Sequence, residues 1–219
     1  MTDTVALAWS GGKDSLMALA ALETDGFKIA ALLTTLTDPY QRVSMHGLRE
    51  SLLDAQAAAL ALPLAKARMS KNADNASYRA SFAAALKPLV ENGVTSIAFG
   101  DLFLTDVRAF REEQMRAAGL DATFPIWHTP TDTLARRFIA SGHRAILVCV
   151  DAEQLAPAFL GREYNAKLLS ELPPGVDPCG ENGEFHTFVY AGPRLAHPVA
   201  FRAGRREVRD ERFHFLDLV

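Results

Sequence analysis

A six-residue segment, Ser-Gly-Gly-Lys-Asp-Ser at residues 10–15, has the residue types of a phosphate-binding loop. Gly11 and Gly12 permit positive φ angles and a close backbone approach, and the amides at a helix start point toward an anion. Lys13 adds a positive charge to this end of the helix. We therefore predict that residues 10–15, called the glycine loop below, bind the phosphates of a nucleotide.

The polar side chains of the glycine loop refine this prediction. The hydroxyls of Ser10 and Ser15 can donate hydrogen bonds to phosphate oxygens. Asp14 would repel a phosphate unless a cation pairs with it, so we expect it to hold Mg²⁺ or to cap the helix. The alternative is an ordinary strand-to-helix turn, which needs neither the lysine nor both serines.

The spacing of the loop excludes two common phosphate-binding motifs. The Walker motif requires a glycine five positions before its Gly-Lys pair, where this chain has Leu7, and a Ser or Thr after the lysine, where it has Asp14. The Gly-x-Gly-x-x-Gly pattern of dinucleotide-binding folds is absent as well.

A second group of polar residues follows the segment Ser96–Phe99, which we interpret as a strand. Asp101 comes just after it, where a carboxylate can reach a ligand or Mg²⁺, and Arg108 lies on the next predicted helix as a candidate substrate-binding residue. The alternatives are a turn aspartate and a solvated helix face.

A third group lies near the C-terminus, in Asp-Pro-Cys-Gly-Glu-Asn-Gly-Glu-Phe-His-Thr-Phe-Val. Glu181 and Glu184 could orient a nucleophile or bind substrate, His186 could move a proton, and Thr187 could contact substrate. The alternative is a turn with solvated acids.

Two further residues have open interpretations. His46 is a candidate polar contact near the site, although the sequence slightly favours a surface or core histidine. Cys179 has no recognisable Cys-His-Asn framework, and a lone cysteine is usually inert.

Periodicity and turn signals predict strands that alternate with helices over residues 1–150. The predicted strands are Thr4–Trp9, Phe27–Thr35, Leu64–Met69, Ser96–Phe99, Thr123–Trp127 and Arg144–Val150, and Thr37–Val43 is a predicted loop. The predicted helices are Asp14–Thr24, Gly47–Leu62, Asn75–Asn92, Asp106–Ala118 and Asp132–Ser141.

This alternation indicates an α/β fold, a doubly wound and mainly parallel sheet with helices on both faces. Ligands bind such sheets at the carboxyl ends of strands, which here selects the glycine loop, Gly100–Asp101 and the region Trp127–Thr129. Residues 151–219 are predicted to form a smaller α+β lobe for substrate binding. It has an interrupted helical segment, Leu155–Leu172, and a hairpin whose edge could pair in a homodimer.

Composition narrows the class of protein. The chain has 219 residues, a net charge of -3 and two cysteines, too few for a disulfide framework. The absence of a basic field argues against a nucleic-acid partner. No signal peptide or long apolar run is recognisable, so we expect a cytoplasmic protein without a membrane partner.

The glycine loop after an N-terminal strand resembles the PP-loop of the ATP pyrophosphatases, the adenine nucleotide alpha hydrolase superfamily. Together with Met-His-Gly at 45–47, the Asp101 segment and the C-terminal group, it resembles the diphthine–ammonia ligase family over nearly the whole chain, in the same order. The resemblance implies cleavage of ATP between its α and β phosphates. The archetypal reaction of that family amidates diphthine on elongation factor 2 with ammonium and releases AMP and pyrophosphate.

The C-terminal group departs from the family pattern Glu-Gly-Gly-Glu-Tyr/Phe-Glu-Thr at two positions, Asn182 and His186. This form resembles a bacterial subgroup that has been associated with cobalamin salvage. The resemblance therefore implies Mg-ATP, a carboxylate on a protein side chain or a small molecule, and ammonium or an amine. The alternatives are a nucleotide-binding sensor without turnover and a tRNA-modifying sulfur or lysine transferase. The sequence has neither basic patches nor paired catalytic cysteines, which argues against the transferase.

Overall fold

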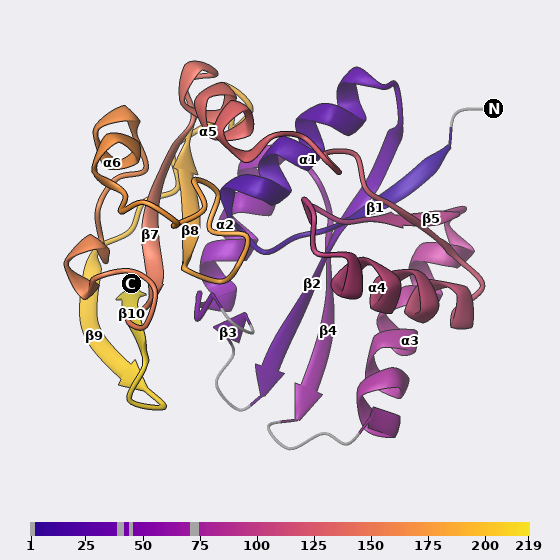
Figure 1. The fold of residues 1–219 in the computed structure, drawn as a ribbon. Coiled ribbons are helices and arrows are strands. Elements are labelled where there is room, and N and C mark those ends of the chain that lie inside the picture. Colours follow the sequence, from indigo (N-terminus) through magenta and orange to yellow (C-terminus); the bar gives the residue numbers. More distant parts are fainter. Residues whose placement is uncertain (1–2, 39–41, 44–45, 71–74) are drawn as a thin grey trace.

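The computed structural model describes residues 3–38, 42–43, 46–70 and 75–219, which form two β-sheets with helices packed against them (Figure 1). The strands are β1 Thr4–Ala8, β2 Lys28–Asp38, β3 Arg42–Val43, β4 Leu64–Ser70, β5 Ser96–Ala98, β6 Asp121–Thr123, β7 Arg144–Asp151, β8 Phe185–Ala191, β9 Ala203–Arg209 and β10 Phe213–Leu218. The helices are α1 Lys13–Thr24, α2 Glu50–Leu60, α3 Asn75–Glu91, α4 Thr105–Ala117, α5 Thr131–Ala140 and α6 Ala166–Glu171, with a 3₁₀ turn at Pro157–Phe159.

The first sheet has the order β3-β2-β1-β5-β6, and β4 also pairs with β2. The pairs β1–β2, β1–β5, β5–β6 and β2–β4 are parallel, and the short β3 is antiparallel to β2. Strand β1 is central, and the chain runs outward from it first to β2 and later to β5. The glycine loop therefore leaves the sheet where the strand order reverses, the usual ligand site of such sheets.

The helices lie on both faces of this sheet because alternate side chains of its strands point to opposite sides. Val5 and Leu7 of β1 pack in one hydrophobic core with leucines of α1 and α2, whereas Ala6 packs in a second core with residues of α3 and α4. The doubly wound, mainly parallel α/β sheet that the sequence predicts is thus confirmed. Within the described residues, no helix is both long and apolar enough to cross a membrane.

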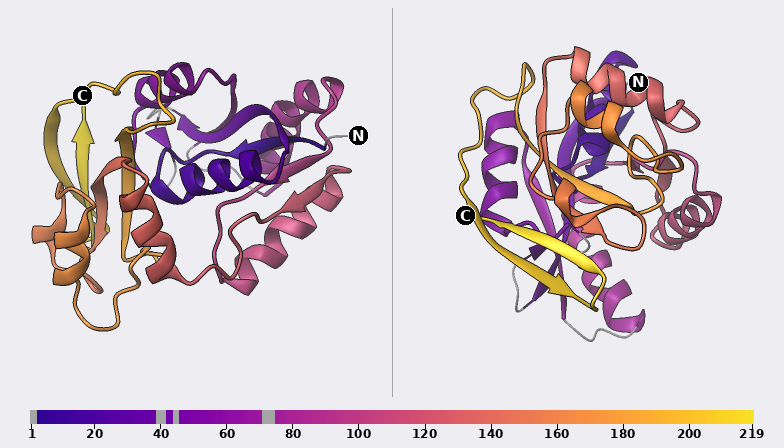
Figure 2. Two further views of the ribbon diagram at one scale, coloured as in Figure 1. Left: turned by 90° about the horizontal axis from the view of Figure 1, so that it is seen from above. Right: turned by 60° about the vertical axis from the view of Figure 1, so that its left-hand side comes forward.

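The second sheet is antiparallel and has the order β8-β7-β10-β9. Figure 2 shows its strands gathered on one side of the molecule, and its residues Leu147 and Phe188 share a core with α1 and α2. Strand β7 was expected to continue the parallel sheet, and that expectation is wrong. The division after residue 150 stays a prediction, as does a homodimer through the outer strand β9.

Three local predictions are also corrected. The predicted strand Thr123–Trp127 is wrong, because β6 ends at Thr123 and residues 125–128 form a turn. The segment Leu155–Leu172 holds only the 3₁₀ turn and α6, with Gly161 between them at a positive φ of 82°. The predicted loop Thr37–Val43 instead contains the end of β2 and β3, and its Pro39 lies outside the described residues.

Candidate active site

The backbone of the glycine loop needs glycine at position 11. Gly11 has a φ of 82°, and a Cβ atom there would lie 2.8 Å from Leu53 Cδ2 and 2.9 Å from Gln56 Oε1. Its carbonyl oxygen accepts hydrogen bonds from the Val189 amide and from Gln56 Nε2, each at 2.9 Å. Helix α2 and strand β8 therefore hold the loop in a conformation that other residues adopt only with strain.

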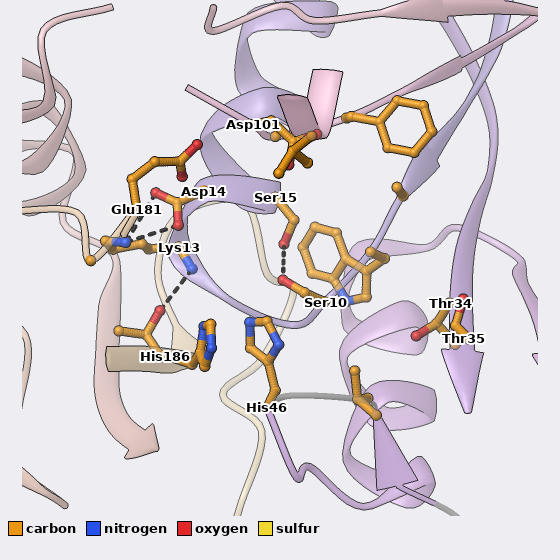
Figure 3. Close-up of a pocket in the computed structure, with 18 of the residues that line it drawn as sticks. Ser10, Lys13, Asp14, Ser15, Thr34, Thr35, His46, Asp101, Glu181 and His186 are labelled. Carbon is orange, nitrogen blue, oxygen red and sulfur yellow. Dashed lines mark hydrogen bonds and ion pairs between the residues drawn. The ribbon is translucent and has the colours of Figure 1, made fainter. Parts of the chain in front are cut away.

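Strand β8 of the second sheet also supports the start of α1. The Lys13 amide donates a hydrogen bond to Thr187 Oγ1 at 3.1 Å, and a Cβ atom at Gly12 would lie 3.1 Å from the Thr187 carbonyl oxygen. Within the loop, Ser15 Oγ donates to the Gly12 carbonyl at 2.8 Å, and the Ser10 and Ser15 hydroxyls are 3.4 Å apart. Both predicted serines thus face the same space at the helix start (Figure 3).

The Lys13 side chain is buried beside Asp14. Its Nζ donates to both carboxylate oxygens of Asp14, at 3.0 and 2.8 Å, and to the carbonyl oxygen of Cys179. The rings of Tyr164 and Phe185 lie 5.5 Å from the same nitrogen. Burial lowers the pKa of Lys13, but the neighbouring Asp14 carboxylate outweighs this effect, so the pKa is raised and the lysine stays charged.

Three carboxylates, Asp14, Asp101 and Glu181, form what we call the carboxylate cluster. Glu181 Oε1 accepts a hydrogen bond from the Leu102 amide at 2.6 Å, which brings the C-terminal segment to the end of β5. Burial, aided by the charges of Asp14 and Asp101, raises the pKa of Glu181 to about 7. Burial also raises the pKa of Asp101 and that of Asp14. Glu181 can therefore exchange a proton near neutral pH.

Two histidines lie together opposite the carboxylate cluster (Figure 3). The ring centroids of His46 and His186 are 4.3 Å apart, although 140 positions separate them in the chain. Burial, together with the charge of Lys13, lowers the pKa of His186 to about 4. His186 is therefore neutral at pH 7 and can accept a proton or a hydrogen bond.

These groups surround one cavity of about 430 Å³. Its wall is built by the ends of β1, β2 and β5, by the starts of α1 and β8, and by the segment before β8. The predicted site residues on it are Ser10, Lys13, Asp14, Ser15, His46, Asp101, Glu181, His186 and Thr187. Of the three expected ligand positions in the sheet, Trp127–Thr129 is the one that does not reach this wall.

Four predicted site residues lie off the cavity wall. Gly11 packs against α2 and Gly12 against Thr187 of β8, and the side chains of Glu184 and Arg108 point elsewhere. Glu184 is buried, and its Oε1 accepts from the amide of Asp177 at 2.8 Å and from Asn182 Nδ2 at 3.1 Å, so it shapes the loop before β8. Arg108 pairs with Glu112 at 2.7 Å and stacks over the rings of Phe124 and Trp127. Neither side chain belongs to the cavity wall.

The prediction of site residues missed several parts of the wall. Arg111 of α4 lines the cavity one turn beyond Arg108, and Thr34 and Thr35 line it near the end of β2. The rule that ligands bind at the carboxyl ends of strands could have found the threonines. The phase of a helix relative to its sheet decides between Arg108 and Arg111, and the sequence alone does not give that phase.

Cys179 does not act as a nucleophile in this arrangement. Its Sγ lies 3.3 Å from the carbonyl oxygen of Thr131, and its side chain is buried. Burial raises the pKa of the Cys179 thiol to about 12, so the reactive thiolate is scarce at neutral pH.

The carboxylate cluster fits a magnesium ion that phosphates share. In the described part of the chain, no three His, Cys, Asp or Glu side chains are placed to hold a metal ion by themselves. Asp101 Oδ2 is nevertheless buried without a hydrogen-bond partner among the described residues. Mg²⁺ is usually bound through one or two carboxylates together with substrate phosphates, which agrees with Asp101 and Asp14 as its protein ligands.

Two family models match most of the chain. The model of the diphthamide synthase N-terminal domain matches residues 3–122, and the model of its C-terminal domain matches residues 130–214. The chain belongs to the diphthamide synthase family. Membership of the diphthamide synthase family confirms the prediction of a diphthine–ammonia ligase-type enzyme.

Two individual relatives are diphthine–ammonia ligases. The diphthine–ammonia ligase of Rattus norvegicus is 27% identical over 217 residues, with 84% of this chain and 78% of that protein covered. The diphthine–ammonia ligase of Mus musculus is 26% identical over 216 residues with the same coverage, 84% and 78%. Both alignments span most of each chain.

Solved structures give weaker matches to this member of the diphthamide synthase family. A chain described as a predicted subunit of tRNA methyltransferase from Methanocaldococcus jannaschii is 16% identical with a TM-score of 0.42, covering 85% of this chain and 96% of that one. The U34-tRNA thiolase NcsA from Methanococcus maripaludis is 15% identical with a TM-score of 0.38, covering 61% and 55%.

Proposed function

We propose that this protein is an ATP-dependent ligase that transfers AMP to a substrate carboxylate and then joins the carboxyl carbon to ammonia or an amine. One observation carries the proposal: the glycine loop opens into the same cavity as Glu181 and His186 from the C-terminal segment. A phosphate-binding loop and proton-transfer groups thus face one space large enough for a nucleotide. The diphthine–ammonia ligases of rat and mouse support the same chemistry.

In this proposal the glycine loop binds the β and γ phosphates of ATP. The positive end of α1 faces the phosphates, the Ser10 and Ser15 hydroxyls lie beside them, and Lys13 supplies the charge. Asp101 and Asp14 would hold Mg²⁺, which would neutralise phosphate charge when it is bound. The loop is fixed by α2 and β8 before ATP arrives, so little reorganisation is needed when the pyrophosphate leaves.

The second step requires an uncharged nitrogen nucleophile. Glu181, with a pKa of about 7, is partly ionised at neutral pH and can take a proton from ammonium or an amine. Neutral His186 lies across the cavity and can accept a hydrogen bond from the same nucleophile. The nucleophile then attacks the acyl-adenylate, the bond from the carboxyl carbon to the AMP oxygen breaks, and AMP leaves.

The substrate carboxylate belongs to a modified protein side chain or to a small molecule. Of the two departures from the family pattern, Asn182 donates a hydrogen bond to Glu184 and stays off the cavity wall, whereas His186 lines it. His186 is therefore the departure that reaches the substrate. This supports membership of the bacterial subgroup and a substrate other than diphthine, such as a small molecule in cobalamin salvage.

Product analysis tests the proposal. The protein is incubated with Mg-ATP, ammonium and a panel of carboxylates that includes cobalamin precursors, and the nucleotides are separated. AMP with pyrophosphate is the expected result. ADP with phosphate would contradict adenylation, and tight ATP binding without turnover would favour a sensor.

A further inference from the structure

Arg111 of α4 lies on the cavity wall beside the end of β5. Its guanidinium carbon is 4.9 Å from the centre of the Phe99 ring, and its Nε lies 3.7 Å from Asp101 Oδ2. Arg111 Nε and Asp101 Oδ2 are both buried, and neither has a hydrogen-bond partner among the described residues. Buried polar atoms normally have partners in folded proteins, so this pair indicates a ligand.

The charges around the cavity show which kind of ligand Arg111 suits. Lys13 and Arg111 are the lysine and arginine side chains on the described wall. Lys13 already donates to both Asp14 oxygens and to a backbone carbonyl, and it belongs to the phosphate side of the site. Among the described residues Arg111 has one ion pair, with Asp101, and its distance of 3.7 Å between Nε and Oδ2 is longer than a hydrogen bond. It can therefore donate to an anion.

The carboxylate cluster favours such a cation on the wall. Asp14, Asp101 and Glu181 line the same cavity, and those that are ionised repel another carboxylate that enters it. A positive charge on the wall offsets this repulsion when a substrate carboxylate approaches ATP. A guanidinium has a planar set of donors that matches the two oxygens of a carboxylate, and stacking on Phe99 limits its rotation.

We propose that Arg111 binds the substrate carboxylate, and that Asp101 and Phe99 orient its guanidinium. One carboxylate oxygen then forms a bond to the α-phosphorus of ATP. The bond from that phosphorus to the oxygen bridging to the β-phosphorus breaks, and pyrophosphate leaves with the electron pair. This inference rests on the proposed function and extends it, because it names the residue that selects an acidic substrate.

The test measures carboxylate and nucleotide binding separately. Acetate labelled with ¹³C is titrated by NMR into the protein saturated with α,β-methylene-ATP, and calorimetry gives the affinity for that ATP analogue. The variants are Arg111→Met, Arg111→Lys and Arg116→Met. Arg116 is exposed in the last turn of the same helix and off the cavity wall, so its variant is the matched control.

Wild type and Arg116→Met should broaden the acetate signal in a saturable way. Arg111→Met should bind acetate at least about tenfold more weakly, because a charge-assisted hydrogen bond is lost. Arg111→Lys keeps the charge but not the planar donors, so its acetate affinity should lie between those of wild type and Arg111→Met. All four proteins should bind the ATP analogue with affinities within about twofold, which also shows that the variants fold.

Two results would overturn the inference. One is acetate binding in Arg111→Met equal to that of wild type, or none in wild type. The other is a large loss of ATP-analogue affinity in Arg111→Met, which would make Arg111 a nucleotide contact. Failure of wild type to bind the analogue at all would instead count against the proposed function.

Discussion

The Lys13 amide and the Thr187 hydroxyl are joined by a hydrogen bond of 3.1 Å, across 174 positions of sequence. This bond ties the first turn of α1 in the parallel sheet to β8 in the antiparallel sheet. The glycine loop of one sheet is therefore positioned by a side chain of the other, and the two cannot move independently without breaking this contact.

Replacing Thr187 tests this link. Thr187→Val keeps the shape but removes the acceptor of the Lys13 amide, which leaves a buried amide without its partner. We expect the Kd for α,β-methylene-ATP to rise by about tenfold, measured by calorimetry, whereas Thr187→Ser should bind nearly as wild type does. Equal affinities for the Val and Ser variants would show that the hydroxyl does not position the loop.

Lys13→Ala should abolish adenylation. The change removes the buried charge at the phosphate site and leaves the Asp14 carboxylate facing the nucleotide, so we expect AMP formation to fall by at least about 100-fold. The measurement is AMP and pyrophosphate release under saturating Mg-ATP. Unchanged release would remove the glycine loop from the mechanism.

Gly11→Ala separates backbone strain from crowding. Gly11 and Gly26 have φ angles of 82° and 79°, but only at Gly11 would the new methyl meet atoms within 3 Å, whereas nothing lies within 4 Å of it at Gly26. Gly26→Ala should cost about 1 kcal/mol of unfolding free energy, and Gly11→Ala more, up to about 3 kcal/mol. Urea unfolding measures both.

The same pair of variants reports on the site. Gly11→Ala should also lose ATP-analogue binding, because α2 and β8 would be pushed from the loop, whereas Gly26→Ala should retain it. Equal stability and affinity for the two variants would contradict the close packing described for Gly11.

The pKa of Glu181 predicts a pH-dependent stability. The folded-state pKa of about 7 lies above the ordinary value of 4.5, so the folded protein binds the proton more tightly than the unfolded chain. Stability from this group is fully present below pH 4.5 and is lost as the pH rises through 7. Glu181→Gln removes this dependence, so its Tm relative to wild type should rise between pH 4.5 and 7 and then level off. A constant Tm difference across that range would show that folding does not raise the pKa of Glu181.

The sequence predicted which segments meet at the cavity better than it predicted which side chains point into it. The glycine loop, Asp101, Glu181 and His186 were found because their types and their places after strands are local features. Arg108 and Glu184 were chosen by the same local reasoning, yet their side chains lie off the cavity wall. Their direction depends on how α4 and the loop before β8 pack, which is not a local property.

Local sequence features also predicted one part of the fold and not the other. Alternating apolar strands and helices with turn signals determined the parallel sheet, because periodicity and chain breaks act over a few residues. The pairing of β7 with β8 and β10 follows from contacts between distant segments, and an apolar strand fits either sheet. The sequence by itself thus identified the family and predicted the glycine loop as the place where nucleotide phosphates bind. Only the tertiary structure decided that β8 supports the glycine loop, that His46 meets His186, and that Arg111 rather than Arg108 faces the cavity, because these contacts join segments whose separation in the chain carries no local signal.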